Sequence, residues 1–379
     1  MIKEIIFFSI GDSNSLSTWS NVPFFFAKTL EEYGIVVHRY DLTQQQIKIP
    51  IVCLYKTWFK ILRLIYSKHV QNFHRTRYFK AHALRIINNA VKRHPSADCC
   101  LFMGYDFYNK FSSIPTILFS DWTSDMYFER VGRKPYWFER RYIKQQELAI
   151  ANSSLTFSLF ELCAKKLHDK YPQIPIEFLK GNVINVLEEP NKQIIERKKS
   201  GKILLIGGRK YINGAKMLIE AFNLLTQDNK QISLHIIGMQ KKLFSETDLD
   251  TSNVHFYGYL KKDVEKERKQ YYDLISTAQI VVNPSPLWAG YSSTIEAMYY
   301  YTPIIVSPYE EFVNEFGNNI NFGLYTDNTI EKLAENINSI LHHPHYTELC
   351  LNAHNRVSNY TWNHYIGNFL FSINRVLAL

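Results

Sequence analysis

Three segments in the second half of the chain carry the residues best suited to chemistry. The first is KILLIGGRKYINGAKMLIEAF, residues 202–222, in which an apolar stretch typical of a strand ends in Gly207 and Gly208. Glycines let the backbone approach a bound group closely. Arg209 and Lys210 follow, and two cations at the end of a strand suit the charge of a diphosphate. A plain strand–turn–helix unit with surface charges would show the same pattern.

The second segment is NPSPLWAGYSSTIEAM, residues 283–298, where a loop with Gly290 precedes an expected helix. The free amides at the start of such a helix bind anions. Those amides belong to Tyr291, Ser292, Ser293 and Thr294. Glu296 falls in the first helical turn, where its carboxylate could accept hydrogen bonds from ribose hydroxyls. An N-capped helix with an acid near its N-terminus is the alternative interpretation.

The third segment is VHFYGYL, residues 254–260, a strand that ends at Gly258. Its backbone, up to Tyr259, could flank a planar base. Open α/β sheets bind their ligands at the carboxyl ends of the strands. We therefore expect the three segments to meet at one edge of a sheet.

The elements that must position these residues alternate between strand and helix patterns in both halves of the chain. In the first half, strands are expected at 3–10, 36–40, 99–104 and 115–120, and helices at 20–33, 138–150 and 159–170. In the second half, strands are expected at 202–206, 232–237, 254–257, 279–282 and 303–306, with a helix at 214–226. This alternation is typical of parallel sheets covered by helices. It predicts an α/β protein with two Rossmann-like domains joined by a linker at residues 181–200.

Charge separates the two halves. Residues 1–180 contain 25 Lys and Arg against 15 Asp and Glu, a net charge of +10. The remaining 19 basic and 20 acidic residues give −1, so an anionic partner belongs with the first half. The five cysteines have no pairing pattern, the first residues lack the features of a signal peptide, and no run of 18 apolar residues occurs. We expect a cytoplasmic protein.

The order of these segments resembles the large retaining glycosyltransferase family four, which has the GT-B fold. The resemblance rests mainly on the second half and is looser in the first. The matching motifs are GGR with LIEAF, HIIG (235–238), VHFYGYL (254–260), NPS with EAM, and TPIIVS (302–307). The final segment, YTWNHYIGNFLFSINRVL, resembles the family's C-terminal helix that returns to the first domain.

The resemblance implies an acceptor-binding domain at 1–180, with helix 362–379 packed on it, and a nucleotide-sugar-binding domain at 201–361, the two sheets facing across a cleft. It also implies transfer with retention and without a metal or other cofactor, from a UDP- or GDP-sugar to a glycan or lipid-linked acceptor. Arg209, with Lys210 or Lys216, would stabilise the leaving diphosphate. The family's N-terminal Gly-Gly loop falls near Ser17 and Thr18, and its active-site histidine falls on Asp121.

Two positions depart from the family pattern. The first glutamate of its E-x7-E pair falls on Trp288 or Ala289, although Glu296 matches the second. The family's lysine after the Gly-Arg strand falls on Asn213. An enzyme of bacterial cell-surface polysaccharide or lipopolysaccharide synthesis is therefore one interpretation, and a catalytically impaired nucleotide-sugar-binding or scaffold protein of the same fold is the other.

The interval between Asp41 and Asp98 contains eleven basic residues and no acidic one. Within it, KTWFKILRLIYSK (56–68) is amphipathic if helical. Lys56, Lys60 and Arg63 then share one face, while Trp58, Ile61, Leu62 and Ile65 share another. Such a helix can lie in a membrane interface. We expect peripheral attachment to an anionic membrane surface, the inner face of the cell membrane; a helix packed on the core is the alternative.

Other sequence patterns are weaker evidence of function. Asp248-Leu249-Asp250 resembles a metal-binding DxD motif but lies in a polar loop away from the expected strand ends. His342, His343, His345, Cys350 and His354 are metal-ligand types, but they span a helix end and the next helix. No nucleic-acid-binding signature accompanies the basic half. The sequence therefore predicts neither a metal site nor a nucleic-acid partner.

Overall fold

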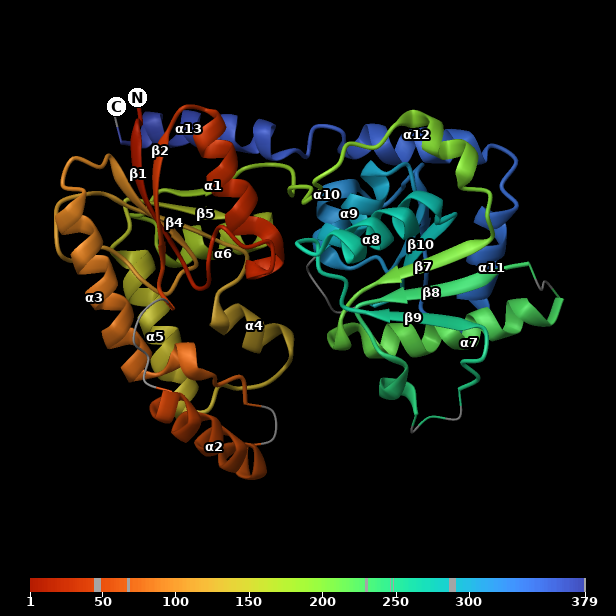
Figure 1. Cartoon of the computed structure of the whole chain (residues 1–379), viewed down its shortest axis with the longest axis horizontal. Coiled ribbons are helices and arrows are strands. Elements are labelled where there is room, and N and C mark those ends of the chain that lie inside the picture. Colours follow the sequence, from red (N-terminus) through yellow and green to blue (C-terminus); the bar gives the residue numbers. More distant parts are fainter. Residues whose placement is uncertain are drawn as a thin grey trace. The chain divides into compact units, whose positions relative to one another are not determined.

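The computed structural model describes residues 1–43, 49–66, 69–228, 231–245, 247, 249–285 and 291–377. The chain divides into two compact units (Figure 1). Unit 1 comprises Met1–Lys180 with Trp362–Leu379, and unit 2 comprises Gly181–Thr361. Each holds a six-stranded sheet in which every strand pair is parallel. The prediction of two Rossmann-like α/β units is therefore confirmed.

The sheet of unit 1 has the strand order β2-β1-β3-β4-β5-β6. Its strands are β1 (Glu4–Ser9), β2 (Val36–Asp41), β3 (Cys99–Met103), β4 (Thr116–Ser120), β5 (Leu155–Ser158) and β6 (Ile176–Phe178). Strands β3, β4 and β5 are buried throughout. This is why they appear in the sequence as apolar runs without alternation.

Seven helices connect or cover these strands among the described residues. They are α1 (Val22–Glu32), α2 (Ile49–Ile65), α3 (Arg77–Arg93), α4 (Ser124–Arg130), α5 (Trp137–Ala151), α6 (Glu161–Lys170) and α13 (Trp362–Val376). The last of them comes from the end of the chain and packs beside α1 (Figure 1). Phe26 of α1 contacts Phe369 of α13 with ring centroids 4.8 Å apart, and Phe119 of β4 at 4.9 Å. This aromatic contact holds α13 in the core of unit 1.

The sheet of unit 2 has the order β12-β11-β10-β7-β8-β9. Its strands are β7 (Lys202–Ile206), β8 (Ser233–Ile237), β9 (Val254–Gly258), β10 (Ile280–Asn283), β11 (Ile304–Val306) and β12 (Gly323–Tyr325). Its helices are α7 (Ile212–Asp228), α8 (Glu265–Thr277), α9 (Ser292–Tyr299), α10 (Glu310–Phe316), α11 (Ile330–Leu341) and α12 (Tyr346–Val357). Helix α7 packs with α11, and α9 packs with α12.

The segment expected to be a linker, residues 181–200, lies at the start of unit 2. Lys198 near its end is fully buried, and its ammonium donates to the carbonyls of Ile275 (3.1 Å) and Ala278 (3.3 Å) and to Thr302 Oγ1 (2.6 Å). Burial lowers the pKa of Lys198 to about 7. The end of this segment is therefore anchored in unit 2.

Among the described residues, no helix is both long enough and apolar enough to span a bilayer.

Candidate functional site

The ends of β7, β8 and β9 are tied together through three glycines. The amide of Gly207 donates to the carbonyl of Ile237 (2.9 Å), and the amide of Gly238 donates to the carbonyl of Gly258 (2.6 Å). Gly238 has φ +97°, and a Cβ on it would lie 2.5 Å from the carbonyl oxygen of Gly207. Only glycine fits so close a backbone contact. Two of the three sequence segments, 202–222 and 254–260, thus meet at the carboxyl edge of the sheet.

The third segment joins this edge from β10 and α9. A Cβ on Gly214 would lie 2.4 Å from Ser285 Oγ, so the first turn of α7 packs directly on the loop after β10. Ser293 Oγ in the first turn of α9 donates to the carbonyl of Ile206 (3.3 Å). The glycine turn, the loop after β10 and the start of α9 therefore surround the end of β7.

Two buried polar atoms lie in this loop. Asn283 Oδ1 and Ser285 Oγ make no hydrogen bond to any described residue. Buried polar atoms are nearly always paired, so each unpaired one calls for an explanation such as water or a ligand. Gly290 and the alternative positions of the missing glutamate, Trp288 and Ala289, fall outside the described residues.

The predicted phosphate-binding cations lie just after β7. Arg209 and Lys210 are exposed and belong to a short 3-10 helix, Arg209–Tyr211. The Lys210 ammonium lies 4.9 Å from the centroid of the Tyr211 ring, and a Cβ on Gly207 would lie 2.5 Å from that ring. Tyr211 therefore fixes the turn that carries both cations. The sequence did not indicate this role of Tyr211, because an aromatic residue before a helix is typical of an ordinary core position.

Three other predicted contacts differ in exposure. Asn213 at the start of α7 is exposed, and Lys216 one turn later is half-buried. Tyr259 is 65% exposed directly after Gly258, which has φ +65°. An exposed aromatic ring at the end of β9 is available for stacking on a base.

Glu296 is buried and carries two contacts that its sequence position does not reveal. One carboxylate oxygen, Oε1, pairs with the Lys262 ammonium, and the other, Oε2, accepts a hydrogen bond from Tyr271 Oη (3.0 Å). Lys262 also donates to the carbonyl of Asn185 (2.8 Å). Burial and the Glu296 carboxylate raise the pKa of Tyr271, which therefore remains a donor. A ribose hydroxyl would have to share this carboxylate with Lys262 and Tyr271.

The remaining predicted residues of the α9 segment surround its N-terminus. Tyr291 is buried, with its ring centroid 5.6 Å from that of Phe312 and 5.7 Å from that of Phe316. Ser292 and Ser293 are half-buried, and Thr294 is buried. The anchored Tyr291 ring fixes where the amides at the start of α9 begin.

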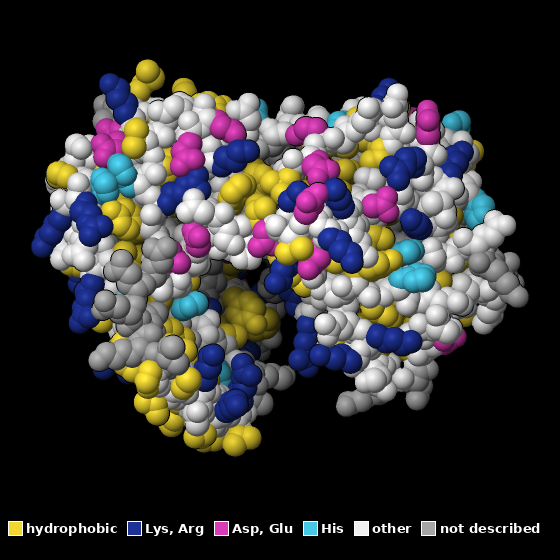
Figure 2. All heavy atoms as spheres, in the orientation of Figure 1, with side chains coloured by type: hydrophobic (Ala, Val, Ile, Leu, Met, Phe, Trp, Pro, Cys, Tyr) yellow, Lys and Arg dark blue, Asp and Glu magenta, His cyan; other side chains and the backbone are white. Residues whose placement is uncertain are grey.

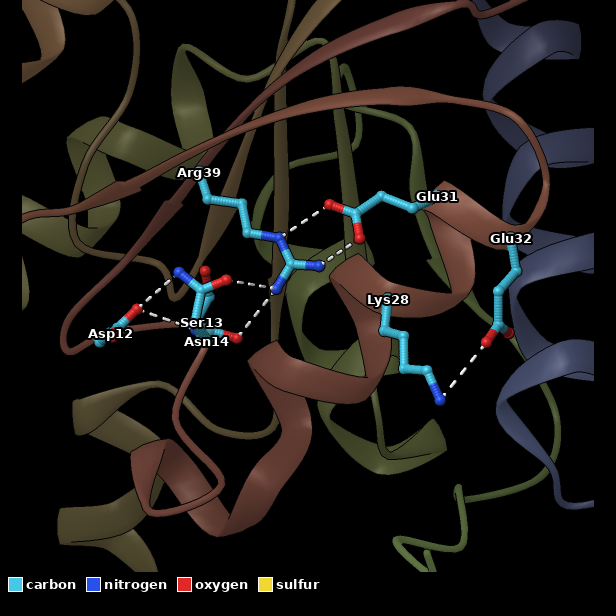
Figure 3. Close-up of polar contacts among 7 residues, drawn as sticks. All are labelled: Asp12, Ser13, Asn14, Lys28, Glu31, Glu32 and Arg39. Carbon is cyan, nitrogen blue, oxygen red and sulfur yellow. Dashed lines mark hydrogen bonds and ion pairs between the residues drawn. The ribbon is translucent and has the colours of Figure 1, made fainter. Parts of the chain in front are cut away.

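In unit 1, the loop after β1 holds Ser17 and Thr18. Thr18 Oγ1 donates to the carbonyl of Asp12 (2.6 Å), and Trp19, Ser20 and Asn21 all have positive φ. Arg39 of β2 fixes the start of this loop by donating to the carbonyl of Ser13 (3.2 Å) and to Asn14 Oδ1 (3.1 Å) (Figure 3). Its guanidinium also forms a two-pronged ion pair with Glu31 of α1, at 3.0 and 2.6 Å (Figure 3).

Asp121 follows β4 directly and is half-buried. Its Oδ1 accepts from the amide of Trp122 (2.7 Å) and from Ser120 Oγ (3.3 Å). Asp121 thus stands at the carboxyl edge of the unit 1 sheet in a fixed orientation.

Sequence reasoning missed two further acids at this edge. Asp41 at the end of β2 accepts from the amide of Gly11 (2.9 Å). Asp106 follows β3 and accepts from Gln146 Nε2 (2.9 Å), and burial raises its pKa. Desolvation lowers the pKa of the nearby His74, and this effect outweighs the opposite effect of the Asp41 and Asp106 carboxylates. The position of these two acids, at or just after the end of an expected strand, could have identified them from the sequence.

Helix α2 presents an unusual surface. Leu54, Trp58, Ile61 and Ile65, spaced i, i+4, i+7 and i+11, have exposed fractions of 70%, 53%, 45% and 69%. Leu62, which was predicted to share this face, is instead buried at 7%. Lys56, Lys60 and Arg63 are exposed. Figure 2 shows hydrophobic side chains at the lower end of unit 1, over α2, with Lys and Arg side chains beside them.

The remaining sequence signals are the DxD sequence and the C-terminal histidines. Asp248 of the DxD sequence is outside the described residues. His354 Nδ1 contacts the carbonyl of Tyr299 (2.6 Å), and its ring stacks on Tyr301 with centroids 4.0 Å apart. His354 is therefore engaged in packing.

Comparisons with known proteins agree with this arrangement. Residues 188–361 match the family model of glycosyl transferases group 1. A search of curated protein sequences finds no match. HepE of Anabaena, solved with UDP and glucose, is similar to this chain at 13% identity and TM-score 0.59, covering 98% of this chain and 100% of HepE. TarM is similar at 12% identity and TM-score 0.68, covering 100% of this chain and 99% of TarM.

WaaG, a glycosyltransferase involved in lipopolysaccharide biosynthesis, is similar at 16% identity and TM-score 0.62, covering 93% of this chain and 95% of WaaG. At such identities the likeness concerns the fold, and it extends over both units. Residues 188–361 are thus similar to the group 1 glycosyltransferases, and the two units have the GT-B fold.

Proposed function

We propose that the protein transfers a sugar, with retention of anomeric configuration, from a UDP- or GDP-sugar to a glycan or lipid-linked acceptor in bacterial cell-surface polysaccharide or lipopolysaccharide synthesis. The observation that carries the proposal is a convergence at the carboxyl edge of the unit 2 sheet. Glycine turns, exposed cations and buried polar atoms that lack a partner among the described residues meet there. HepE of Anabaena, which was solved with UDP-glucose, supports a UDP-sugar as donor.

In this proposal the unit 2 edge holds the leaving group. Arg209, with Lys210 or Lys216, and the amides at the start of α9 would neutralise the negative charge that grows on the diphosphate as the glycosidic bond breaks. Glu296 would bind the ribose, and Tyr259 would lie by the base. Asp121 of unit 1 would orient a sugar hydroxyl or stabilise positive charge at the anomeric carbon. No metal or other cofactor takes part.

A nucleotide-binding panel tests the proposal. The protein is titrated with UDP, GDP and their common sugars while thermal stability and nucleotide release are followed. A ligand that binds only the folded state raises its stability with concentration, so one nucleotide series should raise the unfolding temperature. No response to either series would contradict the proposal.

Ser285→Ala sharpens the same test. Because Ser285 Oγ lacks a partner among the described residues, its removal should leave the stability of the free protein unchanged or higher. Nucleotide affinity should fall by about 5- to 10-fold, as expected for one lost hydrogen bond. Ser245→Ala, at an exposed serine in the same unit, is the matched control. A loss of stability without a loss of affinity would make Ser285 a structural residue only.

The competing function is nucleotide-sugar binding without catalysis. This alternative is suggested by Trp288 or Ala289, one of which takes the position of the family's first glutamate and provides no carboxylate. Release of free sugar from the donor without acceptor separates the two proposals, because a binding protein lacking catalysis gives none. Nucleotide binding without hydrolysis or transfer across a broad acceptor panel would favour the binding protein.

We further propose that α2 attaches the protein to the cytoplasmic face of an anionic membrane. The exposed stripe of Leu54, Trp58, Ile61 and Ile65 would enter the acyl boundary, and Lys56, Lys60 and Arg63 would meet lipid phosphates. Each basic residue near such a surface contributes about 1 kcal/mol. The lack of any acid between Asp41 and Asp98 favours a lipid surface over a protein partner of mixed charge. A lipid-linked acceptor would be met where it resides.

Co-sedimentation with liposomes of increasing anionic lipid content tests the attachment. Binding should rise with anionic lipid, fall with salt, and weaken in a Lys56→Glu/Lys60→Glu/Arg63→Glu variant. The control reverses three exposed lysines of unit 2, Lys192, Lys199 and Lys266, with the same change in net charge. Trp58→Ala should weaken binding without changing its salt dependence. Equal effects of both charge-reversal triples, or indifference to lipid charge, would remove the membrane from the proposal.

A further inference from the structure

Three side chains from distant parts of unit 1 converge near the amino ends of its strands. Glu4 begins β1, His38 lies in β2, and His94 follows α3. Glu4 Oε1 lies 2.8 Å from His38 Nε2 and 3.9 Å from His94 Nδ1, and the three ligand-type atoms all lie within 4.8 Å of one another. One carboxylate oxygen thus faces two imidazole nitrogens.

The outer atoms of two of these groups, His94 and Glu4, already have hydrogen-bond partners. Tyr40 Oη lies 2.9 Å from His94 Nε2, and Ser96 Oγ donates to Glu4 Oε2 (3.1 Å). Metal-binding histidines commonly use the second ring nitrogen in such a bond, which sets the tautomer and orients the first nitrogen. The tyrosine and serine therefore direct His94 Nδ1 and Glu4 Oε1 towards the common centre.

We propose that Glu4, His38 and His94 form a binding site for a divalent transition-metal ion, with Zn²⁺ the best suited. Two imidazoles and one carboxylate are a common set of zinc ligands, with bonds of about 2.0–2.2 Å. In a tetrahedral site such bonds separate ligand atoms by about 3.3 Å, between the 2.8 and 3.9 Å found here. The distances from Glu4 Oε1 to the two imidazole nitrogens are therefore close to those of a tetrahedral site.

The two histidine rings must also turn. Their centroids are 3.6 Å apart and their planes are inclined by 17°, so the two rings stack face to face. A bound ion must lie close to the plane of each ring, so the rings splay when it enters. The side chains of Glu4, His38 and His94 are 25%, 26% and 21% exposed, which leaves room for this motion and for a water at the fourth position.

The site is separate from the transferase chemistry. Glu4 and the carboxyl-end residue Ser9 stand at opposite ends of β1, about 17 Å apart at the usual rise of a strand. The ion would cross-link β1, β2 and the end of α3, so its effect is on the stability of unit 1. This inference does not depend on the proposed function.

Calorimetric titration of the chelator-treated full chain with Zn²⁺ tests the site, in a Cys53→Ser background that removes the exposed thiol. We expect one ion per chain and a rise in the unfolding temperature. His38→Ala and His94→Ala should each weaken binding by more than about 100-fold, and Tyr40→Phe by about 10- to 100-fold. His168→Ala, at an exposed histidine of the same unit, should have no effect.

Cobalt absorption provides a second readout, because Co²⁺ in a tetrahedral site of nitrogen and oxygen ligands gives visible bands that the His38→Ala variant should lose. Where an alanine variant does not fold, as judged by circular dichroism, Glu4→Gln retains the shape and removes the charge. The proposal would be overturned if the Cys53→Ser parent bound Zn²⁺ no more tightly than the His38→Ala and Glu4→Gln variants do. So would a site lost equally in His168→Ala.

Discussion

Breaking the ion pair between Lys262 and Glu296 tests how the buried interior of unit 2 supports its proposed nucleotide site. The side chains are 9% and 6% exposed. Lys262→Met leaves the Glu296 carboxylate buried beside the Tyr271 hydroxyl, which still donates to its Oε2 (3.0 Å). Removing one partner of a buried pair costs about 3–5 kcal/mol because the other charge stays uncompensated. We expect a loss of stability of that size.

The reverse change should cost less. Glu296→Gln keeps an oxygen that can accept from Lys262, and the Lys262 ammonium retains the carbonyl of Asn185 (2.8 Å). In the double variant Lys262→Met/Glu296→Gln no charge remains buried at this place. Its loss of stability should therefore be smaller than that of Lys262→Met alone, which gives a coupling energy of about 2–3 kcal/mol.

Urea unfolding of the full chain gives the four free energies of unfolding, and calorimetric titration with nucleoside diphosphate gives the affinities. If Glu296 also binds ribose, Glu296→Gln should weaken nucleotide binding by about 1–3 kcal/mol, or roughly 5- to 150-fold. Glu348→Gln, at an exposed acid of the same unit, is the control. Additive stability losses would refute the ion-pair reasoning. Unchanged affinity in the well-folded double variant would refute the ribose role.

Arg209→Ala should lower kcat by about 100-fold or more, because charge on the leaving diphosphate grows in the transition state; an effect confined to KM in steady-state kinetics would contradict this. Asp121→Asn should impair transfer while nucleoside diphosphate binding stays unchanged in calorimetry, whereas equal losses would indicate a structural role. Burial, His255 and Lys202 lower the pKa of His235 from 6.5 to about 4. The unfolded chain therefore binds the proton more readily, and stability should fall as pH drops from about 6.5 towards 4. Thermal unfolding of His235→Gln should show a shallower fall.

Much of the fold follows from local patterns in the sequence. The expected strand at 202–206 is found unchanged as β7, and the helix expected at 20–33 is found as α1 over Val22–Glu32. Short β-branched runs bounded by glycine or proline carry this information because strand and helix periodicity depend on near neighbours in sequence. The motifs around Gly208 and Glu296 likewise indicated the edge of the sheet at which the three segments meet.

The partners of the functional side chains were decided by the tertiary structure. Glu296 is neutralised by Lys262, 34 residues earlier in the chain. Asn283 Oδ1 and Ser285 Oγ are buried without a hydrogen bond to any described residue. Leu62 is buried while Trp58, one turn away on the same helix, is exposed. Helical periodicity divides α2 into faces, but only the packing against the rest of unit 1 selects the face that is covered. Glu4, His38 and His94 meet for the same reason, because parallel crossovers bring together residues that no local pattern relates.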